Sequence, residues 1–250
     1  MNTQVFKRAS MTAALLASAA FVQSAMAHTV LEVSSLAEAT RAYNNVVIGH
    51  ACGTTPVMGA SVVFPDGASS IIKVNGQIHN GPLTDFVSNW GPSISVVQSN
   101  ELFSESGVKR GPTGNIVGFW AGGGDVLSPD MIGRLPFRVN AVNIAPSSCA
   151  TSVVFRVAIV DVCEITSASE LQAGGHDGAP VGLWTMAGLG TPYDAASDNA
   201  ARLTINRNTT SNPLPAACGN GVSVEVQPSA EQILRDMPIV TGGVQIWPEL

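Results

Sequence analysis

The 250-residue sequence lacks the motifs that most enzymes use for catalysis. It contains no Gly-x-Ser-x-Gly elbow and no His-Glu-x-x-His zinc motif. Gly122–Gly124 precedes no Gly-Lys-Ser/Thr and is therefore a loop glycine run, not a phosphate-binding loop. The acidic residues are dispersed, so paired-carboxylate chemistry has no support. We therefore expect a protein that is not an enzyme and has no catalytic residue.

Helical periodicity is also nearly absent, and short β-rich runs recur between Gly, Pro, Asn and Ser clusters. Such runs predict strands at 29–33, 45–48, 60–64, 70–74, 94–97, 115–120, 135–142, 152–162, 182–185, 202–205 and 222–226. This many short strands favours a β-sandwich or barrel. One short helix is expected near the end, with Ser229 as its N-cap, Gln232 as the capping-box partner and Pro238 as its stop.

Residues 1–27 have the pattern of a secretory signal: a basic start, an apolar stretch and a small-residue cleavage motif at Ala25–Ala27. After the signal, the run Val153–Val160 is too short to span a bilayer and contains Arg156. We expect a periplasmic or secreted protein that is not inserted in a membrane.

The net charge limits which classes of partner the protein can bind. The signal holds two basic residues and no acid, so its removal changes the formal net charge from -6 to -8. A scattered acidic surface argues against nucleic acid and anionic membranes as partners.

Cys52, Cys149, Cys163 and Cys218 are even in number and all lie in the exported part. Export to an oxidising compartment predicts two disulfides. Thiolate metal ligation is the alternative, but the sequence has no Cys-x-x-Cys pair, which such sites usually carry.

His28 becomes the first residue if cleavage follows Ala27. Its free α-amine and its imidazole can then chelate one metal ion, because an α-amine loses its proton near neutral pH. Copper(II) gains most from two nitrogen donors. The alternative is that the signal is cut before whichever residue follows, and that a histidine at this position has no role in metal binding.

The other histidines and the tryptophans have ordinary structural interpretations. His50, at a strand end beside Cys52, suits a hydrogen-bonded loop residue, and His79 and His176 lie in turns. Tryptophans in an all-β chain usually fill the core, although one can also wall a metal site.

Several segments, in order, resemble the YcnI-like copper-binding domain family of exported bacterial proteins. They are Ala27–Glu32, Ile48–Gly53, Val62–Gly67, Asn89–Gly91, Phe119–Gly123, Phe137–Arg138, Val162–Glu164 and Trp184. The resemblance covers residues 28–185, so we expect a sandwich domain there. Residues 186–250 form a loop-rich C-terminal extension packed on the sandwich or completing it.

The resemblance implies an immunoglobulin-like β-sandwich and a copper(II) site with a single histidine. His28 is the implied anchor, Trp184 the wall, and Glu32 or Asp66 the acidic ligand, with His50 as a weaker candidate. It also implies a Cys52–Cys163 disulfide, which leaves Cys149 and Cys218 to form the second.

The sequence leads to three alternative hypotheses for the function. The leading expectation is a periplasmic copper chaperone or copper buffer with copper(II) as its ligand, and with a membrane copper transporter or another copper chaperone as partner. The alternatives are a metal-free exported binding or structural module, and a histidine-brace copper oxidase that would add His50 as a second histidine.

Overall fold

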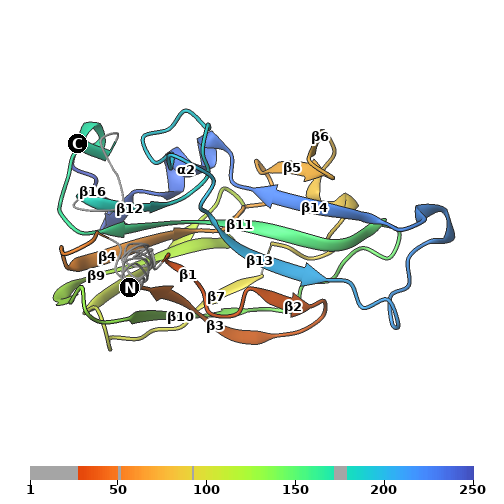
Figure 1. Cartoon of the computed structure of the whole chain (residues 1–250), viewed down its shortest axis with the longest axis horizontal. Helices are drawn as coiled ribbons and strands as arrows, with labels where there is room; N and C mark the ends of the chain where they lie inside the picture. The colour runs from red at the N-terminus through yellow and green to blue at the C-terminus, as the bar shows by residue number, and fades with distance from the viewer. Residues whose placement is uncertain (1–27, 50–51, 92, 172–178) are drawn as a thin grey trace, which may run out of the picture.

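The computed structural model describes residues 28–49, 52–91, 93–171 and 179–250. The signal segment 1–27, His50 and His176 lie outside the described residues. Two sheets pack face to face along one long axis (Figure 1), which confirms the all-β prediction. No helix among the described residues is long and apolar enough to cross a bilayer.

The smaller sheet is antiparallel and has the order β1-β3-β10-β7. Its strands are β1 (Val30–Leu31), β3 (Ala42–Ile48), β10 (Gly133–Val139) and β7 (Ile94–Val96). β3 alternates buried and less buried positions, as expected of a strand with one face on the core.

The larger sheet has the order β6-β5-β14-β11-β4-β9-β8, with β12, β13 and β2 attached to it. Its strands are β2 (Ser35–Ala37), β4 (Val57–Val63), β5 (Ile71–Val74), β6 (Gln77–His79), β8 (Glu105–Arg110), β9 (Ile116–Leu127), β11 (Ala150–Val162), β12 (Val181–Trp184), β13 (Ala201–Asn206) and β14 (Val222–Gln227). His79 therefore ends a strand, whereas the sequence predicted a turn.

β11 is the central strand of the molecule. Its first half lies between β13 and β14, and its second half lies between β4 and β12. Both of its faces are covered: Phe155 and Ile159 face the core between the sheets, and Val160 faces a second apolar cluster on the outer side. This explains why its sequence is a nearly continuous apolar run.

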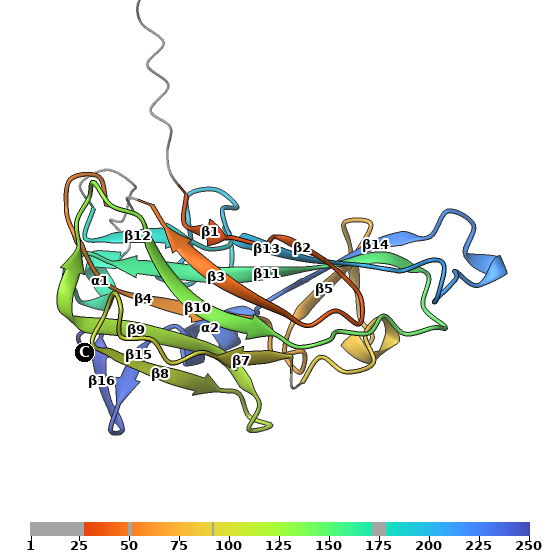
Figure 2. The ribbon, with the colours of Figure 1, turned by 90° about the horizontal axis from the view of Figure 1, so that it is seen from below.

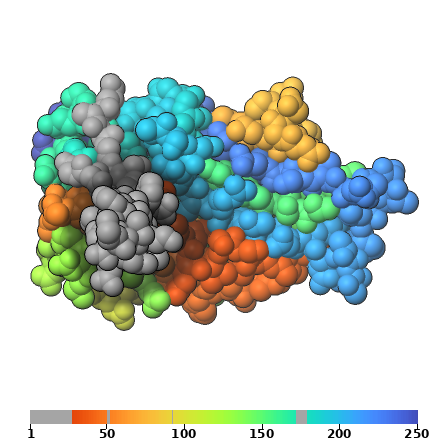
Figure 3. Space-filling view, in the orientation of Figure 1, coloured from red at the N-terminus to blue at the C-terminus, as the bar shows by residue number. Residues whose placement is uncertain are grey.

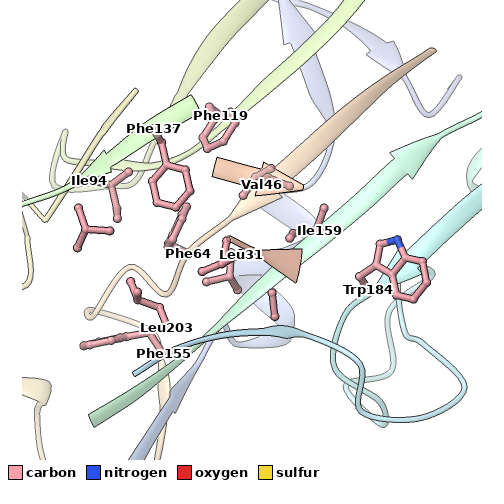
Figure 4. Close-up of a cluster of buried hydrophobic side chains, with 14 of the residues drawn as sticks. Leu31, Val46, Phe64, Ile94, Phe119, Phe137, Phe155, Ile159, Trp184 and Leu203 are labelled. Atoms are coloured by element: carbon pink, nitrogen blue, oxygen red, sulfur yellow. The ribbon is translucent and has the colours of Figure 1, made fainter. Parts of the chain in front are cut away.

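The core between the sheets is rich in phenylalanine. Figure 4 shows Phe64, Phe119 and Phe137 gathered together, with ring centroids 5.4 Å apart for Phe64 and Phe137. Trp184 belongs to the same buried cluster but lies apart from these rings (Figure 4). The core thus extends to the end of the sandwich that carries β1 and β12.

The outer face of the larger sheet is covered by the C-terminal part of the chain. The helix α2 (Ala230–Asp236) and the hairpin β15 (Ile239–Thr241) and β16 (Val244–Trp247) lie on this face. Ser229 caps α2 by accepting a hydrogen bond from the backbone N–H of Gln232 at 3.1 Å, as predicted. A second helix, α1 (Ala168–Leu171), and 3₁₀ turns at Leu83–Asp85 and Ala216–Cys218 were not predicted.

Residues 186–250 also contribute strands to the larger sheet. β13 pairs with β11 and, in parallel, with β2, while β14 pairs in parallel with β11. Figure 3 shows the orange-red segment of β2 and β3 lying directly against the blue-cyan segment of β13. These strands are therefore integral to the sandwich.

The molecule has one disulfide at each of its two ends. Cys52–Cys163 lies at the end with β1 and β12, and Cys149–Cys218 lies at the opposite end. Both pairings agree with the expectation. Two disulfides suit a non-reducing compartment.

The glycine run 122–124 is a correction to the sequence analysis. It lies inside β9 and not in a loop. Gly122 pairs with both Gly59 and Glu105, and Gly123 and Gly124 have positive φ angles of 73° and 74°. The glycines make an irregularity that bends the strand without ending it.

Candidate metal site

Asp161 is a completely buried carboxylate near the end of β11. Its side chain lies on the same face of β11 as Ile159, which faces the core. The residues paired with it are Ala60 on β4 and Gly182 on β12, both small. The strand register thus leaves room for a charged group at this end of an otherwise apolar core.

The two oxygens of Asp161 have different surroundings. Oδ2 accepts a hydrogen bond from Thr29 Oγ1 at 2.5 Å and another from Trp184 Nε1 at 2.6 Å. Oδ1 is buried and has no hydrogen-bond partner within the described part of the chain. A buried carboxylate oxygen without a donor is costly unless some other group satisfies it.

Burial raises the pKa of Asp161 to about 7, and the hydrogen bonds from Thr29 and Trp184 oppose this shift. The charged form is disfavoured because it is removed from water. A cation beside the carboxylate would reverse this preference.

His28 directly precedes Thr29, the residue whose hydroxyl donates to this carboxylate. Thr29 is fully buried and anchored to Asp161, whereas His28 is exposed. The His28 imidazole packs on Trp184, with ring centroids 4.9 Å apart and planes inclined by 56°. The structure therefore brings together His28 and Trp184, two residues that the sequence analysis assigned to one site.

The local backbone around Asp161 is fixed by covalent and hydrogen-bonded links. The Cys52–Cys163 disulfide begins two residues beyond it. The backbone N–H of Cys163 donates to Pro180 O at 3.0 Å, just before β12 begins. Asp161 is on β11, Trp184 is on β12, and Thr29 directly precedes β1; Figure 2 shows β1 and β12 next to β11.

The two acids predicted from the sequence have other partners. Glu32 accepts hydrogen bonds from Arg134 Nη2 at 2.9 Å and from Asn45 Nδ2 at 2.5 Å. It shares the outer face of β1 with His28 by alternation but is engaged with these neighbours.

Asp66 lies in the turn after β4. It accepts hydrogen bonds from Ser69 and is paired with Arg235 at 3.1 Å. It is six residues beyond Ala60, the register partner of Asp161, which places it roughly 20 Å along the sheet. The structure does not bring it to His28.

Sequence reasoning missed Asp161. A signal for it was present in the sequence, because Asp161 is a single acid inside the apolar, strand-length run 157–162. An acid in such a run is expected to be buried, and a buried acid needs a hydrogen-bond partner or a functional role. Among the described residues, no group of three or more His, Cys, Asp or Glu side chains is placed to hold a metal ion.

Comparison with known proteins gives no family. No family model matches the chain, and no curated protein matches it. A solved structure of an uncharacterized protein from Nocardia farcinica, described as having an immunoglobulin-like fold, is similar over 72% of this chain and 98% of that chain. The identity is 14% and the TM-score is 0.35.

Proposed function

We propose that the protein is an exported copper(II)-binding protein that acts as a copper chaperone or buffer. The observation that carries the proposal is the environment of Asp161. A buried carboxylate, with one oxygen unsatisfied among the described residues, is hydrogen-bonded to the residue that follows His28. Removal of residues 1–27 would place a new α-amine beside this carboxylate.

The donor set suits copper(II) in chemical type. The α-amine and imidazole of His28 supply two nitrogens, and Asp161 supplies an oxygen. The negative charge of the carboxylate offsets the positive charge of the metal ion. The hydrogen bond between Thr29 and Asp161 keeps the start of the chain close to the carboxylate. Glu32 and Asp66 are set aside as ligands because Arg134 and Arg235 already neutralise them.

Trp184 supports the site in two ways. Its indole N–H orients Asp161 through Oδ2, and its ring covers one side of the His28 imidazole. Such outer groups orient ligands and limit access of water. His28 itself stays exposed, which suits transfer of the ion to a copper transporter or another copper chaperone.

The test is a copper(II) titration of the protein beginning at His28, followed by electron paramagnetic resonance. We expect tight binding with nitrogen hyperfine structure. Adding one alanine before His28, or replacing Asp161→Asn, is expected to weaken binding at least tenfold. His79→Ala is the matched control, because His79 is paired with Asp85 away from the site.

Tight binding that survives the added alanine would reject the proposal. In that case a metal-free exported binding or structural module becomes the better interpretation. Peroxide-dependent turnover would instead favour the histidine-brace oxidase, whose second histidine, His50, lies outside the described residues.

A further inference from the structure

A cavity of about 230 Å³ lies on the outer side of the larger sheet, beneath the hairpin β15–β16. Val162 lines it, whereas its neighbour Asp161 lies on the core side of the same strand. The sheet therefore separates this cavity from the candidate metal site. Figure 2 shows the hairpin beside β8 and β9, at the end of the molecule that carries β12.

The walls of the cavity are apolar. Trp120 on β9 and Trp247 on β16 contribute indole rings, and Met58, Ile239 and Ile246 contribute aliphatic side chains. Part of the floor is bare backbone at Gly59 and Gly122, where a Cβ on Gly59 would lie 2.8 Å from Ala121 O. Close approach of β4 and β9 requires this glycine and leaves the space above it open.

Large apolar side chains at this cavity are left in water. Ile165 is 55% exposed and Ile246 is 42% exposed. A concave apolar site with an exposed apolar border is typical of a ligand pocket. Its volume lies just below the common range for drug-sized ligands, about 300–1,000 Å³, so the ligand is small.

The charge at the cavity has one sign. Glu105 and Asp125 are the charged residues among those that line it. Both are exposed, and neither carboxylate forms a hydrogen bond or ion pair with another residue in the described ranges. Glu105 pairs with Gly122 on β9, so its side chain lies on the same face as Trp120. The cavity therefore combines aromatic surface with uncompensated negative charge.

We propose that this cavity binds a small organic cation, with a compact apolar body and an ammonium group. The apolar walls bury the body of such a ligand. The ammonium is attracted by Glu105 and Asp125 and by the indole faces. The same carboxylates repel an apolar anion, so the cavity selects by charge as well as by shape. This proposal is independent of copper binding.

The experiment is a nuclear magnetic resonance titration of the metal-free protein with benzyltrimethylammonium. The four tryptophan indole N–H signals serve as built-in reporters. We expect saturable shifts at Trp120 and Trp247, with a dissociation constant in or below the millimolar range. The signal of Trp90, which is buried against Phe155 in the core, should not move. Phenylacetate, an apolar anion of similar size, should produce no saturable shift.

Charge variants complete the test. The double variant Glu105→Gln, Asp125→Asn should weaken binding about fivefold, as expected for two exposed charges. Asp130→Asn removes an exposed acid in the nearby β9–β10 turn that does not line the cavity, and should leave binding unchanged. The proposal is overturned if phenylacetate binds as well as the cation, if the double variant binds equally, or if Trp120 and Trp247 do not respond.

Discussion

The two ends of the sandwich each contain a buried carboxylate, but only one of them is fully satisfied. Glu38 lies beside β13 near Ser152, and Asp161 lies nine residues further along β11, roughly 30 Å away. Glu38 accepts hydrogen bonds from the backbone N–H groups of Ile144 and Asn208, at 3.0 and 2.7 Å, and from the Asn212 side chain. Both of its oxygens are engaged.

A buried guanidinium completes the Glu38 end. Arg207 donates to the backbone carbonyls of Pro146, Ser148, Ala150, Asn212 and Pro213 and to the side chain of Asn212. Asn212 thus links Glu38 to Arg207. Such a closed polar network stabilises one arrangement of loops. Asp161 belongs to no such closed network among the described residues, and this contrast is the reason that the proposed metal site is placed at its end.

Removal of the disulfides should give the largest changes in stability, and comparing the two removals distinguishes the two ends of the sandwich. One double variant carries Cys52→Ala and Cys163→Ala, and the other carries Cys149→Ala and Cys218→Ala. Each should lower the free energy of unfolding by about 4 kcal/mol, because the disulfides close long loops in the unfolded chain, with sequence separations of 111 and 69. Denaturant unfolding measures this. Removal of the first pair should speed hydrogen exchange at the Trp184 indole more than removal of the second, because it also loosens the end that carries Trp184. Equal exchange in both double variants would contradict the difference between the ends.

A pH dependence should come from Asp161 in the metal-free protein. Its pKa is raised to about 7, so between about pH 4 and 7 the folded state holds a proton that the unfolded state has lost. The free energy of unfolding should therefore fall by about 4 kcal/mol as the pH rises through this range, and level off above it. Denaturant unfolding of the native chain and of Asp161→Asn isolates the effect. Parallel curves for the two would contradict it.

The smallest expected effects come from amide replacements, and they should differ in sign. Glu38→Gln places an amide NH₂ against N–H donors, so it should lower the free energy of unfolding by about 2 kcal/mol. Asp161→Asn keeps an oxygen for Thr29 and Trp184 and removes a buried charge. The new NH₂ would be buried without an acceptor at the place of Oδ1, which offsets most of the gain from removing the charge. At pH 8 the net effect should be to raise the free energy of unfolding by about 1 kcal/mol. Destabilisation by both replacements in thermal unfolding would remove the distinction.

Much of the fold could be predicted from the sequence, and the site only in part. Each predicted strand has a counterpart, because apolar alternation and turn residues are local signals. β15 and β16 were missed because Val240 and Val244 remain exposed, which hides any alternation. His28 followed from the expected cleavage site, and Trp184 followed from a family resemblance. Asp161 could not be placed, since its contact with Thr29 spans 132 residues and depends on the register of β11.

The hydrogen bond between Thr29 and Asp161 also bears on when the candidate site can exist. It joins the residue just before β1 to β11, across a separation of 132 residues. Contacts of this range carry a large loop-closure cost and form only when the intervening structure is in place. A chain that is half folded therefore has a histidine but no pocket for an ion. Occupancy of the site would report that the whole sandwich has closed, and a bound ion would in turn hold it closed.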